Sequence, residues 1–125
     1  MLLADVVATS TEVSATRSRK AKVAAIAELL SRTDAAELEV VTSYVGGRLR
    51  QRRTGLGWRG LQSLPAAAGS PTLTVLEVHD AFDAIAALAG AGSQAARSTA
   101  VAELFGRATP DEQAWLEERR EFELY

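Results

Sequence analysis

The chain has 125 residues, of which 47% are hydrophobic and 24% are charged, and its formal net charge is −2. At roughly 100–200 residues per domain, this length fits one domain. The absence of cysteine excludes disulfides and thiolate chemistry, and the single histidine excludes a histidine-rich metal site. No apolar run approaches the ~18 residues of a membrane span. Asp5 lies in the first apolar stretch with no positive charge before it, unlike in a signal peptide. We expect a soluble, cytoplasmic protein.

The charges are distributed unevenly along the chain. Residues 1–64 hold ten Lys and Arg against six Asp and Glu, whereas residues 65–125 hold four Arg against ten acids. Such a split indicates that one part of the surface meets an anion and another part does not.

The first half of the chain is expected to hold three helices. The first two are predicted over about 2–14 and 16–31, since apolar residues recur there at a helical spacing. The predicted inward face of the second helix holds Val23, Ile26, Ala27 and Leu30.

Asp34 is predicted to cap the third helix, with Glu37 three residues on as its capping-box partner. The apolar residues of this helix are Leu38, Val41 and Tyr44 or Val45, and its end is expected near Gly46 and Gly47. Glycines and a proline between about 51 and 70 then favour an ordered loop with one short helix.

Three more helices are predicted after this loop. Thr74 is the expected cap of a helix over about 75–88, with Val78, Phe82, Ile85 and Ala89 facing inward. Ser93 is the expected cap of a helix over about 94–107, with Val101, Leu104 and Phe105 facing inward.

The last predicted helix has the clearest start. Thr109 fits an N-cap, Pro110 the first helical position and Glu112 a capping-box partner, and Trp115 and Leu116 follow. No segment longer than 72–75 alternates like a strand. The predicted fold class is therefore all-α, a single domain of about six helices in two related groups, with halves of about 1–64 and 72–125.

The usual catalytic motifs are missing from the sequence. There is no Walker loop with its Lys-Ser/Thr and no Gly-x-Ser-x-Gly elbow. His79 lies between Glu77 and Asp80, which would suit a general base, but a partly exposed helical histidine beside a carboxylate is the commoner case. We expect no catalytic residue, no metal site and no cofactor.

Residues 48–59 form the strongest candidate site. Five arginines occur in these twelve residues with no acid among them: Arg48, Arg50, Arg52, Arg53 and Arg59. Like charges this close repel one another unless an anion meets them, and arginine forks bind phosphate with paired hydrogen bonds. A solvated basic loop after a helix C-terminus remains the alternative.

Two helix starts point to the same chemistry. Helix N-termini favour anions, and one predicted start carries Gly92, Ser93, Gln94 and, a turn later, Arg97. Another carries Arg17, Arg19 and Lys20. Together these three breaks predict several phosphate contacts along one polyanion, contacts of the kind that position a protein without reading base sequence.

The order of these segments resembles the N-terminal DNA-binding domain of ATP-dependent DNA ligases of the actinobacterial type. The resemblance is carried by residues 1–6, 14–23, 44–52, 54–58, 90–97 and 101–113. It implies an all-helical domain of two related halves that grips duplex or nicked DNA through its backbone and minor groove, at the nucleoid. The three basic breaks would then be its phosphate contacts.

The sequence departs from this family in two respects. No Lys-x-Asp-Gly adenylation motif is present, and residues 122–125 replace the Gly-Glu-Leu-Arg-x-Gly expected there. We therefore expect a truncated domain that binds DNA and does not catalyse ligation alone. The alternative is a helical protein-interaction or dimerisation module, in which Trp115, Leu116 and Phe122 form an exposed apolar surface.

Overall fold

A computed structural model describes residues 1–47 and 64–119 of the chain, and the side chains of residues up to 118. Within these ranges the fold is all-α, as predicted, with no strand and one isolated antiparallel bridge between Leu2 and Thr74. The helices are α1 (Leu3–Ala15), α2 (Arg19–Ser31), α3 (Leu38–Val45), α4 (Val75–Ala87), α5 (Ser93–Gly106) and α6 (Pro110–Arg119). No helix of the described ranges is long and apolar enough to span a membrane.

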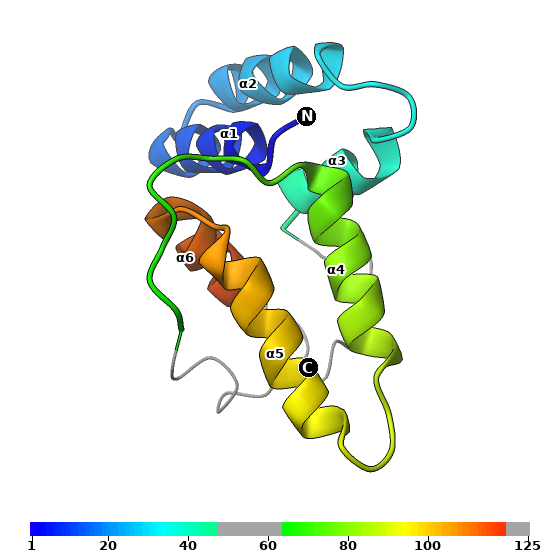
Figure 1. Cartoon of the computed structure of the whole chain (residues 1–125). Helices are drawn as coiled ribbons and strands as arrows, with labels where there is room; N and C mark the ends of the chain where they lie inside the picture. The colour runs from blue at the N-terminus through cyan, green and yellow to red at the C-terminus, as the bar shows by residue number, and fades with distance from the viewer. Residues whose placement is uncertain (48–63, 120–125) are drawn as a thin grey trace.

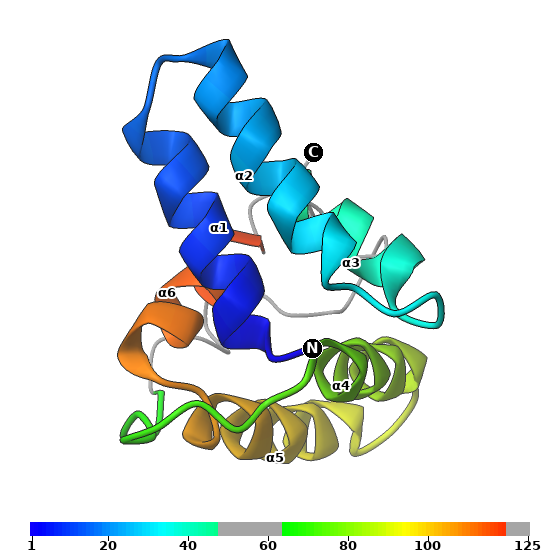
Figure 2. The same ribbon diagram turned by 90° about the horizontal axis from the view of Figure 1, so that it is seen from above.

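The helices are arranged as two hairpins with a shorter helix beside each. α1 and α2 run side by side in opposite directions, and α4 and α5 do the same below them (Figure 1). α3 connects the two hairpins on the α4 side, and α6 returns beneath α1 (Figure 2). In both views, the turn that joins α1 to α2 and the turn that joins α4 to α5 lie at opposite ends of the molecule.

One hydrophobic core joins residues of all six helices. Its largest fully buried side chains include Tyr44, Phe82 and Phe105. The Tyr44 and Trp115 rings pack with centroids 5.3 Å apart, which connects α3 to α6. Burial of the Tyr44 phenol raises its pKa.

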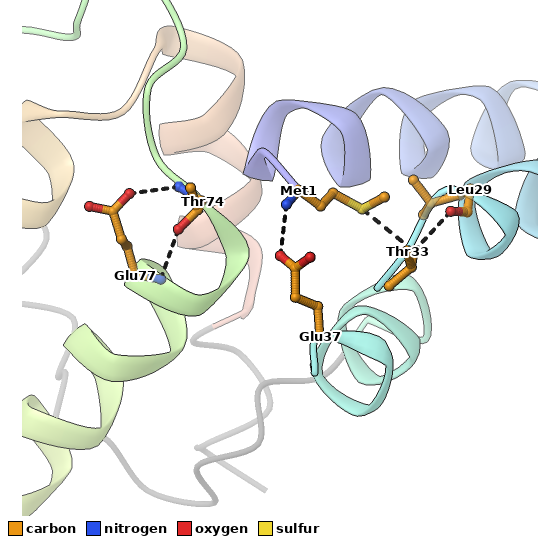
Figure 3. A network of polar contacts seen from close by, with 6 residues as sticks. All are labelled: Met1, Leu29, Thr33, Glu37, Thr74 and Glu77. Atoms are coloured by element: carbon orange, nitrogen blue, oxygen red, sulfur yellow. Dashed lines mark hydrogen bonds and ion pairs between the residues drawn. The ribbon is translucent and has the colours of Figure 1, made fainter. Parts of the chain in front are cut away.

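The N-terminal residues connect the two halves of the chain. The Leu3 amide donates to the Leu73 carbonyl at 2.8 Å, and the Val75 amide donates to the Met1 carbonyl at 3.0 Å. The Met1 ammonium donates to the Glu37 carboxylate at 2.7 Å, and both groups are almost completely buried (Figure 3). These bonds fix the starts of α1, α3 and α4 against one another.

The predicted cap of the third helix is wrong, and the Met1–Glu37 pair supplies the reason. Glu37 is itself the N-cap residue of α3 and makes no side-chain cap bond, because its carboxylate is held by the Met1 ammonium. Asp34 is exposed, and its carbonyl accepts from the Glu37 amide at 3.0 Å within a preceding turn.

The predicted inward face of the second helix is also partly wrong. α2 buries Ala25 and Leu29, whereas Val23 is 61% exposed and Ala27 lies on the surface. Apolar residues occupy most of the circumference of α2, so its periodicity does not define one face, and packing against α1 decides the rotation.

The start of the fifth helix differs from the prediction by one residue. Gly92, with φ of +80°, is the N-cap of α5, and Ser93 is its first helical residue, with its amide donating to the Gly90 carbonyl at 3.2 Å. Glycine adopts this left-handed conformation without steric cost, and because Gly92 carries no side chain it cannot make a side-chain cap. α4 ends at Ala87, which leaves Ala89 exposed rather than inward.

The two threonine caps are confirmed, and each is part of a capping box. Thr74 Oγ1 accepts from the Glu77 amide at 3.2 Å, and the Thr74 amide donates to the Glu77 carboxylate at 3.1 Å (Figure 3). Thr109 and Glu112 make the same reciprocal pair at the start of α6, at 3.3 and 2.8 Å. These boxes fix both helix starts.

The Glu77 carboxylate is expected to make stability depend on acid pH. The Thr74 amide and the Arg107 guanidinium, at 2.9 Å, bond this carboxylate and lower its pKa. A carboxyl with a lowered folded-state pKa stabilises the fold above its usual pKa, and the contribution is lost as pH falls through the folded-state pKa. The free energies of unfolding of wild type and Glu77→Gln, measured in urea, should therefore differ near neutral pH. They should converge as the pH falls from about 5 to 3. A difference that stays constant over this range would contradict the expectation.

Candidate nucleic-acid interface

The turn between α1 and α2 holds a group of cations in a defined backbone. Ser18 is the N-cap of α2, and its Oγ accepts from the Ala21 amide at 3.1 Å. The Ser18 amide in turn donates to Thr16 Oγ1 at 3.1 Å. These bonds define the backbone on which the α2 basic cluster is placed, which consists of Arg17, Arg19, Lys20 and Lys22.

The α2 basic cluster carries charge that no carboxylate offsets within the described ranges. Arg17, Arg19 and Lys20 are exposed and form no ion pair there. The other arginines described at the surface differ, because Arg32 pairs with Glu28 at 2.8 Å and Arg107 pairs with Glu77 at 2.9 Å. The cluster also lies at the N-terminal end of a helix, whose dipole adds positive potential.

Lys22 belongs to this cluster although the sequence analysis did not select it. It is partly buried and follows Lys20 by two residues. Its place in the run 14–23 is the signal that could have identified it.

The turn between α4 and α5 contains the exposed start of a helix and an arginine that is already hydrogen-bonded within the protein. Gly92 and Gln94 are exposed, and Ser93 is partly buried. Arg97 Nη2 donates to the Leu88 carbonyl at 3.0 Å, so at least this guanidinium nitrogen stabilises the turn itself. A phosphate contact by these four residues stays a prediction.

The structure does not bring the two described helix starts together, since their turns lie at opposite ends of the molecule (Figure 2). Phosphate contact at both would require a ligand that extends along the domain. The third candidate group, Arg48, Arg50, Arg52, Arg53 and Arg59, lies outside the described residues.

A groove of about 450 Å³ between α1 and α6 has a different chemistry. Three hydroxyl residues of α1, Ser10, Thr11 and Ser14, face Asp111 and Glu118 of α6 across it. Two carboxylates disfavour a phosphate in this groove, so the candidate interface is the α2 basic cluster rather than the groove.

His79 is the partly exposed helical residue that the sequence indicated. Its Nε2 lies 3.3 Å from the Asp83 carboxylate one turn on. Asp80 brings a third potential ligand atom, and all three lie within 4.8 Å of one another on the surface of α4. Exposed groups of this kind are common without an ion, so the arrangement alone does not define a metal site.

The apolar docking surface expected under the alternative hypothesis is absent where the structure can test it. Trp115 and Leu116 are 4% and 2% exposed and belong to the hydrophobic core. They are covered by the chain itself, with Trp115 against Tyr44. Phe122, the third residue of the expected surface, lies outside the described residues. The predicted homodimer therefore has no support.

Comparison with known proteins shows which family the sequence of this chain is similar to. Residues 61–118 match the model of a family described as DNA ligase N terminus. The chain is also 72% identical to a probable DNA ligase of Nocardioides sp., over 93% of this chain and 24% of the relative. The chain belongs to the DNA ligase N-terminal family. Probable DNA ligases of Kineococcus radiotolerans and Beutenbergia cavernae are 62% and 60% identical over 93% of this chain.

The match to this DNA ligase family is limited to one part of the relatives. The chain spans about a quarter of the length of the curated DNA ligases it matches. Its 125 residues contain no Lys-x-Asp-Gly motif, so this chain alone does not carry adenylation chemistry. No solved structure matches the chain significantly.

Proposed function

We propose that this DNA ligase N-terminal domain binds duplex DNA, nicked or intact, without preference for base sequence, by contacting backbone phosphates. The observation that carries the proposal is the α2 basic cluster, in which Arg17, Arg19 and Lys20 are exposed and unpaired within the described ranges. A polyanion supplies the counter-charge that the protein surface does not supply there.

The position of this cluster suits phosphate contact better than base recognition. Its cations lie at the start of a helix and in the adjoining turn. Exposed side chains at such a place can contact the sugar-phosphate backbone of a DNA duplex. Arginine and lysine contacts to phosphate fix register and orientation without reading sequence. A domain that must accept any nick requires this kind of contact.

Joined to catalytic modules, the domain would hold DNA for ligation in replication, repair and recombination. The curated relatives are named probable DNA ligases and are about four times as long as the matched region. The proposed location is accordingly the cytoplasm, at the nucleoid, where duplex DNA lies.

Anisotropy of a labelled duplex tests the proposal. The purified chain is titrated into a nicked duplex and an intact duplex over about 50–200 mM salt. The logarithm of the binding constant should fall linearly with the logarithm of salt, with a slope of about −0.9 for each phosphate contact. Stronger binding to the nicked duplex would connect the domain to ligation. Absence of binding at the lowest salt, by a chain that circular dichroism shows to be helical, would overturn the proposal.

A further inference from the structure

Val23 is the most exposed large hydrophobic residue of the described ranges, with 61% of its surface open to solvent. It lies on α2, whose buried residues are Ala25 and Leu29. Because most of its surface is open, Val23 contributes less to folding through burial than the core residues do.

Helical spacing places Val23 on the same face as two cations of the α2 basic cluster. Arg19 and Lys20 precede it by four and three residues, and Ala27 follows it by four. Residues at these separations are neighbours on the surface of a helix. Arg19, Lys20 and Ala27 are all exposed. One side of α2 therefore presents two positive charges, followed along the helix by two exposed apolar residues.

The two charges and the apolar residue together fit one class of ligand for this side of α2. The backbone of a nucleic acid presents phosphates, which fit Arg19 and Lys20, and between them sugars whose C–H groups fit a valine methyl. A ribose places a hydroxyl at its 2′ position, and an apolar side chain against that hydroxyl would leave it without a hydrogen-bond partner. Deoxyribose carries no such cost.

We propose that Val23 packs against the deoxyribose backbone of a duplex held by Arg19 and Lys20, and that it makes this site prefer DNA to RNA. This inference rests on the proposed function, since it assigns a specificity-determining residue to the same surface. Salt dependence separates the two contributions to binding, because the affinity gained from phosphate contacts falls with salt and the affinity gained from the apolar contact does not.

Val23→Thr tests the inference with little change in shape. Threonine is also β-branched, has a similar helix propensity and replaces one methyl by a hydroxyl. Wild type and variant are titrated with a DNA duplex and an RNA duplex of the same sequence. We expect wild type to prefer DNA, and the variant to bind DNA about fourfold more weakly, the effect of one lost methyl-sized contact. Its salt dependence should be unchanged and its DNA-to-RNA affinity ratio smaller.

Leu38→Thr is the matched control, because Leu38 is also exposed, at 44%, but lies at the start of α3 away from the α2 basic cluster. It should leave both affinities unchanged. Unaltered DNA affinity and unaltered DNA-to-RNA ratio in Val23→Thr would overturn the inference about Val23. If charge reversal of Arg19 and Lys20 also left DNA binding intact, the proposed function at this cluster would fail as well.

Discussion

Simultaneous replacement of Arg17, Arg19 and Lys20 by glutamate is expected to weaken binding to duplex DNA by about a hundredfold or more, at roughly 1 kcal/mol for each cation removed from a polyanion surface. The loss of three phosphate contacts should also reduce the magnitude of the log–log salt slope by about 2.7. Folding should be little affected, because all three side chains are exposed and unpaired within the described ranges. Anisotropy titrations at several salt concentrations measure both quantities.

Paired cations supply the control for this experiment. In the double variant Arg32→Gln and Arg107→Gln, each arginine removed already faces a carboxylate, Glu28 or Glu77. This variant should bind DNA nearly as wild type does, even though the net charge of the domain has fallen by two. The glutamate variant changes the net charge by six and the control by two. A loss of binding free energy in the control about one third as large would therefore mean that total charge, rather than the α2 basic cluster, determines binding.

The arginines of residues 48–53 can be tested in parallel. The sequence predicts that Arg50, Arg52 and Arg53 also contact phosphate. Their replacement by glutamate, compared with the α2 variant in the same titration, would show which cluster contributes more contacts.

Glu37→Ala is expected to cause the largest loss of stability from a single polar contact. The Glu37 carboxylate and the Met1 ammonium, 2.7 Å apart, are 8% and 3% exposed. Removing one partner leaves the other charge buried and uncompensated, which typically costs about 3–5 kcal/mol. Urea unfolding followed by circular dichroism should show the midpoint displaced to lower urea with little change in slope.

Two further variants sharpen this test. A single residue added before Met1 converts its ammonium into an amide, and should destabilise the domain in the same direction. Asp34→Ala is the control, because Asp34 is exposed and does not cap α3. It should change the free energy of unfolding by no more than about 0.5 kcal/mol. A large loss in Asp34→Ala, with none in Glu37→Ala, would restore the cap predicted from the sequence.

Local sequence signals determined the fold class and most of the helix boundaries. Thr109, Pro110 and Glu112 define the start of α6 through bonds that span three residues, so no tertiary information was needed. The box between Thr74 and Glu77 has the same spacing, and its second member could also have been predicted. Three of the four cations of the α2 basic cluster, Arg17, Arg19 and Lys20, were likewise predicted from the sequence.

Tertiary structure decided the features that depend on contacts distant in sequence. Glu37 was predicted to bond locally, but Met1, 36 residues away, supplies a buried ammonium that a local pattern cannot reveal. Val23 was predicted to face inward, but the rotation of α2 is set by α1, since apolar residues lie all around the helix. Trp115 and Leu116 similarly became core residues once α6 packed beneath α1.

The features of this chain therefore fall into two groups, those set by local interactions and those set by contacts distant in sequence. Helix content, two threonine caps and a run of cations whose charge favours a polyanion follow from residues that are close together in the sequence. The packing of the helices decided which of those cations stay unpaired and that Val23 is exposed to solvent. The physical reason is that hydrogen bonds within a helix connect residues three or four positions apart, whereas burial and ion pairing depend on which helices meet.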